Sequence, residues 1–368
     1  MSAPAEVRTQ PEVGAVAPTT IRALTGLRAV AAVWGVLFHY RFDLLTLVPA
    51  AEPLAPLMAA GYLGVDVFFV LSGFVLAYTY GDRLGRWAPR EAGAFVQNRV
   101  ARVWPAHVVT LHLDLLQAVV VGTLGVGAGG HRRTVSAYLQ NLTMTHSWWN
   151  DRPSFNAPAW SISAEWAAYL ACPLLLLGLA RVRRPVTAAL AATGLFAVLM
   201  TVFALWALPN GNVPHAGMLR IAVEFTAGLL LLRVHQHHPR WLPHLTPLVV
   251  VGVVAAVLLV PAARHGYWLA PALGLLVLLV SVDDGPVARL LGRPGIVFWG
   301  EASYCLYLTH LLLSPGLHAV VEPREVAGAP LVVRLLVLAL YVAALGAAAV
   351  LLRRAVEVPA RRLLRSRT

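Results

Sequence analysis

Two ionisable side chains interrupt an otherwise apolar segment near the start of the chain. Arg28 and His39 lie in the stretch LTGLRAVAAVWGVLFHY, residues 24–40. An ionisable group inside a membrane helix is costly, so its default interpretation is functional. The eleven residue steps from Arg28 to His39 correspond to roughly 16 Å along a helix and return to nearly the same face. One face would therefore present a permanent cation at one depth and a proton-transfer group at another. The alternative is that Arg28 snorkels to lipid phosphates and His39 lies at the far interface.

Three further titratable groups are predicted at the depth of His39. Asp66, Glu165 and His310 each fall in the outer half of a different apolar segment. Convergence on one polar cavity would explain why four such groups share a depth, whereas independent snorkelling would not. In this cavity His39 would deprotonate a hydroxyl as general base. Glu165 or Asp66 would orient its imidazole, as the carboxylate of a catalytic triad does.

A second group of cations is predicted at the other end of the membrane. Arg99 and Arg102 are three residues apart, so they share a helix face, and they lie at about the depth of Arg28. Guanidinium groups bind phosphate bidentately, so the three arginines could hold the phosphates of a large anionic cofactor. Ordinary positive charge at a cytoplasmic helix end is the alternative. A charged nucleotide with a long thin arm, such as acyl-coenzyme A, would place its thioester near His39.

The composition predicts an integral membrane protein with an all-α fold. Of 368 residues, 58% are hydrophobic and 12% are charged, whereas soluble domains usually have about 25% charged residues. Only helices and closed barrels satisfy the backbone in lipid, and the apolar runs are too long for barrel strands. Windows of about 20 apolar residues predict a polytopic bundle of ten transmembrane helices, at residues 23–48, 59–80, 100–122, 158–180, 186–208, 217–234, 245–262, 267–282, 297–320 and 331–352.

The distribution of arginine predicts that both termini are cytoplasmic. In that orientation the inside segments hold 18 arginines and the outside segments hold eight, as the positive-inside rule requires. Residues 1–20 are then a disordered cytoplasmic tail, 21–355 the membrane domain, and 356–368 a basic cytoplasmic tail. We expect a multi-pass protein of the cell (cytoplasmic) membrane.

The charge and the cysteines exclude other classes of partner and cofactor. The net charge is +12 and all 29 basic residues are arginine. In a membrane protein such charge is expected to face anionic lipid, so we predict the bilayer as a partner and no nucleic acid. Cys172 and Cys305 lie in apolar segments, and no Cys/His cluster predicts a metal. The oligomeric state stays open.

One long outer loop, at about residues 123–157, is rich in aromatic residues. Trp148 and Trp149 lie within it, and Trp160 follows it. These rings could anchor the protein at the membrane interface or line an acceptor site. Trp160, Tyr304 and His310 are the candidates for substrate binding.

Five segments in order resemble the acyltransferase-3 family of membrane O-acyltransferases. They are LTGLRAVAAVWGVLFHY, GYLGVDVFFVLSGFVL, NRVARVWPAH, WSISAEWAAYLACPLLL and GEASYCLYLTHL. The family's arginine, ten residues and histidine fall on Arg28 and His39. Its arginine pair falls on Arg99 and Arg102, and its glutamate falls on Glu165.

The resemblance implies ten core spans, acyl-coenzyme A as donor, and a hydroxyl acceptor. Acetyl or another short chain would be moved to a sugar, a cell-envelope glycan or a macrolide-type metabolite. The chain looks most like actinomycete members that act in antibiotic biosynthesis. His39 would be the general base or, in a variant, would itself be acylated. The rival interpretation is a transporter or exporter with a buried His/carboxylate relay.

Overall fold

The computed structural model describes residues 21–123, 133–150, 153–206, 214–259 and 266–366. The predicted tail at 1–20 and part of the predicted outer loop lie outside the described residues. Within them the chain is helical and contains no strand. The predicted all-α, polytopic fold is therefore confirmed.

Ten main helices match the ten predicted segments. They are α1 (Arg22–Leu47), α3 (Gly64–Leu84), α4 (Pro89–Thr123), α6 (Trp160–Leu179), α7 (Pro185–Leu205), α8 (Pro214–Gln236), α9 (Thr246–Leu259), α11 (Ala270–Val282), α13 (Pro294–Val320) and α14 (Leu331–Leu352). Eight helical segments of the described chain are long and apolar enough to cross a membrane. The other two predicted spans are α8, which carries Arg220 and Glu224, and α11, which is short.

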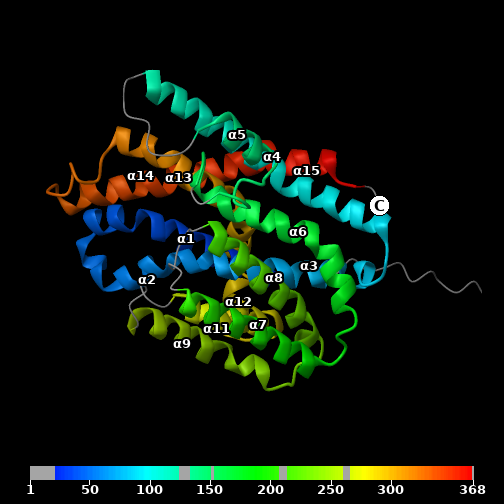
Figure 1. Ribbon diagram of the computed structural model, residues 1–368. Coiled ribbons are helices and arrows are strands. Elements are labelled where there is room, and N and C mark those ends of the chain that lie inside the picture. Colours follow the sequence, from blue (N-terminus) through cyan, green and yellow to red (C-terminus); the bar gives the residue numbers. More distant parts are fainter. Residues whose placement is uncertain (1–20, 124–132, 151–152, 207–213, 260–265, 367–368) are drawn as a thin grey trace, which may run out of the picture.

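Shorter helical pieces connect these helices. They are α2 (Ala55–Ala59), α5 (Val135–Leu142), α12 (Pro286–Leu291), α15 (Val358–Leu364), 3-10 turns at Pro49–Leu54, Ala60–Leu63, Ala157–Ala159, Leu242–Leu245 and Gly266–Leu269, and a π-helical turn at Arg353–Glu357. Proline begins several helices, including α7 and α13, because its missing N–H has no partner in a first turn anyway. In Figure 1, α4 and α15 lie along the upper edge, α7 and α9 along the lower edge, and α1 and α3 run between them.

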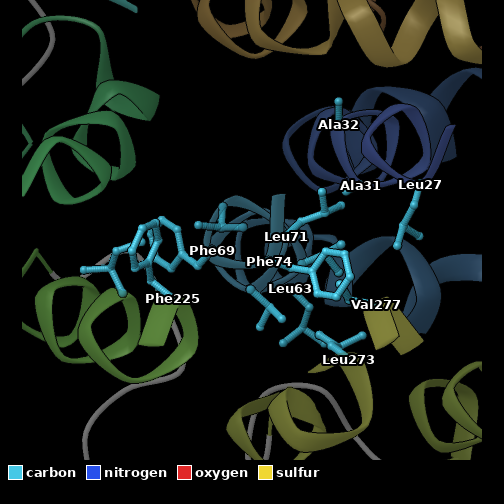
Figure 2. Close-up of a cluster of buried hydrophobic side chains, with 14 of the residues drawn as sticks. Leu27, Ala31, Ala32, Leu63, Phe69, Leu71, Phe74, Phe225, Leu273 and Val277 are labelled. Atoms are coloured by element: carbon cyan, nitrogen blue, oxygen red, sulfur yellow. The ribbon is translucent and has the colours of Figure 1, made fainter. Parts of the chain in front are cut away.

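Helix α3 lies at the centre of the packed interior. Figure 2 shows its Phe69, Leu71 and Phe74 among buried side chains of α1, α8 and α11. Phe225 of α8 and Val277 of α11 close the cluster on two sides, and both are buried. Since lipid is as apolar as these side chains, close packing and not exclusion from water stabilises such a bundle.

Glycines allow α3 and α8 to approach closely. A Cβ atom on Gly73 would overlap the carbonyl oxygen of Phe225, and a Cβ on Gly228 would overlap that of Val70. Each glycine thus leaves room for the backbone of the other helix to pack directly against it. Small residues at helix crossings are the usual device for such contacts in membranes.

We expect Gly228→Ala to lower the thermal stability of the detergent-solubilised protein. The added methyl meets backbone of α3, and overpacking of this kind costs about 1–3 kcal/mol. Gly252 of α9 has open space around it, so Gly252→Ala is the matched control and should be neutral or slightly stabilising, by up to roughly 1 kcal/mol. Fluorescence-monitored unfolding would measure both. Equal midpoints for the two variants would contradict the close crossing.

Candidate active site

A cavity enclosed by α1, α3, α4, α6 and α13 contains the three predicted arginines. Its empty volume is about 810 Å³. The ionisable side chains that line it are Arg28, Arg99, Arg102, Glu165, Tyr169, Tyr304 and Tyr307. We call it the arginine cavity. Arg28 comes from α1, and the i, i+3 spacing of Arg99 and Arg102 puts both on the same face of α4. The expected proximity of the three arginines is thus present, whereas their role in binding a donor stays a prediction.

Within the described residues, two of these arginines have no carboxylate partner. The Nε atoms of Arg28 and Arg99 are buried and have no hydrogen-bond partner within the described part of the chain. Arg99 instead lies over aromatic rings, 5.6 Å from the centroid of Tyr80 and 5.9 Å from that of Tyr169. Cation–π contacts of this kind offset part of the cost of burial. The unused N–H donors leave the cavity suited to an anion.

The third arginine is already paired. Arg102 Nη1 lies 2.7 Å from Glu357 Oε1, and both side chains are largely buried. Glu357 lies at the end of the π-helical turn that follows α14. Glu357 falls in the segment 356–368, which the sequence predicts to be a cytoplasmic tail.

Glu165 lies with the arginines and not with His39. Its Oε1 accepts hydrogen bonds from the hydroxyls of Ser72 and Tyr169. Tyr169 is four residues further along α6, so helical spacing brings the two side chains together. The expected pairing of Glu165 with His39 is therefore corrected: the carboxylate lines the arginine cavity.

Asp66 has a different partner from the one expected. Its two carboxylate oxygens accept from Arg220 Nε at 2.9 Å and from Arg220 Nη2 at 2.6 Å. Both side chains are buried, and Glu224 is buried one turn further along α8. Asp66 thus neutralises an arginine of α8 inside the bundle. Among the described residues the hydrogen-bond partner of Asp66 is thus Arg220 and not His39, so the expected Asp66–His39 contact is not present.

The ring beside His39 is that of His310. The two imidazole centroids are 5.1 Å apart with planes tilted by 45°. His310 Nδ1 lies 2.7 Å from the carbonyl oxygen of Tyr307, which can only accept, so Nδ1 carries the proton and Nε2 is an acceptor. Nε2 is buried and unpartnered among the described residues. Tyr40 Oη donates to the His310 carbonyl at 2.6 Å and ties α1 to α13 at this level.

Two further cavities meet at His39. One, of about 420 Å³, is lined by His39, Trp160 and Tyr307. Tyr307 also lines the arginine cavity, so the two cavities adjoin each other. The other, of about 1170 Å³, is lined by His39, Asp43 and His318. We call these the inner and the outer histidine cavity. His39 is the residue that both of them share.

The remaining candidates are buried near these cavities. Trp160 is 3% exposed and packs edge-on against Phe69, so it does not anchor at a lipid interface. Tyr304 lines the arginine cavity, and its hydroxyl donates to the Val103 carbonyl at 2.5 Å. Substrate binding by Trp160, Tyr304 and His310 stays a prediction.

Some residues of these cavities were not identified from the sequence. Tyr169 could have been found from its i+4 spacing to Glu165. Asp43 also lies four residues after His39, and its Oδ2 is 3.1 Å from His318 Nε2. His318 and Glu357 gave no such signal, because their partners lie far away in the sequence.

Comparison with known proteins assigns the chain to a family. A family model described as an acyltransferase domain matches residues 21–353. Acyltransferase MdmB of Streptomyces mycarofaciens is 32% identical over 117 residues, which are 31% of this chain and 28% of that protein. Protein 2 in the picA locus of Rhizobium radiobacter is 43% identical over 70 residues, which are 18% of this chain and 35% of that protein. No solved structure matches the chain. The matches to MdmB and to the picA-locus protein therefore span only part of the length of each of these two relatives.

Proposed function

The chain belongs to the acyltransferase family whose model matches residues 21–353, and on that premise we propose that it is a membrane O-acyltransferase. It moves a short acyl group, such as acetyl, from acyl-coenzyme A to a hydroxyl of a sugar, a cell-envelope glycan or a macrolide-type metabolite. The observation that carries the proposal is that a cavity with two arginine Nε groups unpartnered among the described residues adjoins the cavity of His39, with Tyr307 lining both.

The arginine cavity is the proposed donor site. Arg28 and Arg99 have buried N–H groups without partners, which phosphate oxygens would satisfy. Arg28 and His39 lie on one helix and are eleven residue steps apart, a span of roughly 16 Å. The extended arm of acyl-coenzyme A suits that span, with its thioester in the inner histidine cavity. This orientation puts the arginine end in the cytoplasm, where arginine counts also favour the termini.

His39 is the proposed general base. It takes the proton from the acceptor hydroxyl while the oxygen attacks the thioester carbonyl. The C–O bond forms, the C–S bond breaks, and the thiolate of coenzyme A leaves with the proton that His39 returns. His310 Nε2 is the nearby free acceptor, and a hydrogen bond from the second N–H of His39 would stabilise the imidazolium, as triad carboxylates do.

The outer histidine cavity is the proposed acceptor site. Asp43, Ser314 and His318 line it together with His39. Carboxylate, hydroxyl and imidazole groups are the partners that hydroxyl-rich molecules use, which supports a sugar-like acceptor. The name of MdmB, an acyltransferase of Streptomyces mycarofaciens, supports the reaction class and, with the resemblance to antibiotic-tailoring proteins, a secondary-metabolite acceptor.

A thiol-release assay tests the proposal. Purified protein in detergent or liposomes is supplied with acetyl-coenzyme A and a panel of glycoside and macrolide acceptors. We expect free coenzyme A to appear only when an acceptor is present, with one acetyl mass added to that acceptor. Movement of an intact acceptor across the liposome without any thiol released would favour the transporter instead.

A further inference from the structure

The segment after the end of the family match is part of the folded structure. The match ends at residue 353, where the π-helical turn Arg353–Glu357 begins, and α15 (Val358–Leu364) follows it. In Figure 1 the red α15 lies beside the cyan α4. Gln97 donates to the Leu364 carbonyl at 3.0 Å, and Asn98 accepts from the Ser366 N–H at 3.0 Å. The segment expected to be a basic tail is thus, through residue 366, docked on the bundle.

The π-helical turn is held by charges at the arginine cavity. Glu357 is 3% exposed; one oxygen pairs with Arg102 at 2.7 Å and the other accepts from Cys305 Sγ at 3.1 Å. Arg353 forms an ion pair with Glu301 of α13. π-helical turns of this kind are rare and frequently occur at functional sites. Here the turn directs α15 back over the bundle.

The docked segment lines a further cavity, next to the arginine cavity. The cavity, about 1530 Å³ in empty volume, shares Arg28, Arg99 and Arg102 with the arginine cavity, so it adjoins that cavity. Its other charged lining residues are Glu301, Arg353, Glu357, Arg361 and Arg365. We call it the mouth. Six arginines face two glutamates there, so the mouth has a strong excess of positive charge.

The arginines of α15 are not equivalent. Arg361 lies in α15, Arg365 directly follows its last residue, and both line the mouth. Arg362 lies between them in sequence and is not among the residues that line the mouth, although all three side chains are exposed. The segment therefore brings two of its three cations to the mouth.

We propose that α15 forms part of the donor site, with Arg361 and Arg365 binding the phosphates at the nucleotide end of acyl-coenzyme A. The inference rests on the proposed function and extends it to a segment outside the family match. The nucleotide carries a diphosphate and a phosphate monoester, too many charges for Arg28 and Arg99 alone. The arm then passes from the mouth through the arginine cavity toward His39. Arg102, held by Glu357, fixes α15 against the bundle.

Binding of coenzyme A and of pantetheine to the purified full chain tests this. Pantetheine has the arm and the thiol but lacks the nucleotide and its phosphates. We expect Arg361→Ala/Arg365→Ala to weaken coenzyme A binding about tenfold or more, since charge-assisted hydrogen bonds to phosphate are lost. Pantetheine binding should not change. Isothermal titration calorimetry in detergent gives both dissociation constants.

Arg362→Ala is the matched control, because it removes one cation from the same helix without touching the mouth. It should leave the affinity for coenzyme A within about twofold of wild type, because a surface charge that does not line the mouth contributes little. Two results would overturn the inference: equal coenzyme A affinity in the double variant and in Arg362→Ala, or an equal loss of pantetheine binding in the double variant. Wild-type protein that binds coenzyme A in this way but never releases it from acetyl-coenzyme A would refute the proposed function alone.

Discussion

His39→Ala protein is expected to lose roughly 10²–10⁴-fold in turnover, the usual contribution of a positioned general base. The affinity for coenzyme A should stay near that of wild type, because the arginine cavity and the mouth lie elsewhere. The loss should therefore appear in kcat and not in the KM for acetyl-coenzyme A. Initial rates of thiol release from proteoliposomes, with the acceptor found in the panel, measure both constants.

The matched control is His318→Ala. His318 lines the outer histidine cavity but lies against Asp43, so its loss should raise the KM for the acceptor more than it lowers kcat. A His39→Ala variant that acylates its acceptor at the wild-type rate would remove His39 from the mechanism. Intact-mass analysis of wild-type protein after acetyl-coenzyme A without acceptor separates the two roles of His39. An added acetyl group that is absent from His39→Ala would indicate acylation of the histidine itself.

Arg220→Ala is expected to prevent accumulation of folded protein or to lower its unfolding midpoint sharply. The change leaves Asp66 buried and unpaired beside the buried Glu224. Breaking a buried ion pair by removing one partner costs about 3–5 kcal/mol. Size-exclusion chromatography and thermal unfolding in detergent measure the effect.

Two comparisons make that prediction specific. Arg181→Ala removes an exposed arginine and should change stability by less than about 0.5 kcal/mol. Arg220→Met/Asp66→Leu replaces both buried charges by apolar groups and should recover most of the loss, since such replacements are often neutral or stabilising. If Arg220→Ala unfolds at the wild-type midpoint, the pair does not stabilise the bundle.

Helix positions could be predicted from the sequence, because the apolar runs that mark them are local patterns. The ten predicted segments all coincide with helices, and Arg28 and His39 share α1 as expected. The partner of each side chain could not be predicted in this way. Asp66 was expected at the depth of His39, but the rotation of α3 points Asp66 to α8 and Arg220. That rotation is set by close crossings such as the one at Gly73 and Gly228, which depth does not reveal.

The carboxyl-terminal contacts were beyond prediction for another reason. Residues 356–368 are rich in arginine, and charge of that density favours a solvated tail at the membrane surface. The helix there is too short to form alone, so it depends on packing against α4 and on the Glu357–Arg102 pair. These two residues are 255 positions apart, a separation at which local patterns carry no information.

The uninterrupted α1 has a consequence for the size of the group transferred. Arg28 and His39 belong to one helix without proline or break, so the distance between them is constant. That distance would fix how far the arm of the proposed donor extends from the arginines to His39. If acyl-coenzyme A binds as proposed, a longer acyl group could not be accommodated by shifting the nucleotide outward without losing its phosphate contacts. The extra carbons would instead have to fit within the inner histidine cavity or project past His39 into the proposed acceptor site. Acyl-chain selectivity would then depend on the residues around His39, where Trp160 and Leu311 line the inner histidine cavity, and substitutions there should alter it while leaving the affinity for coenzyme A unchanged.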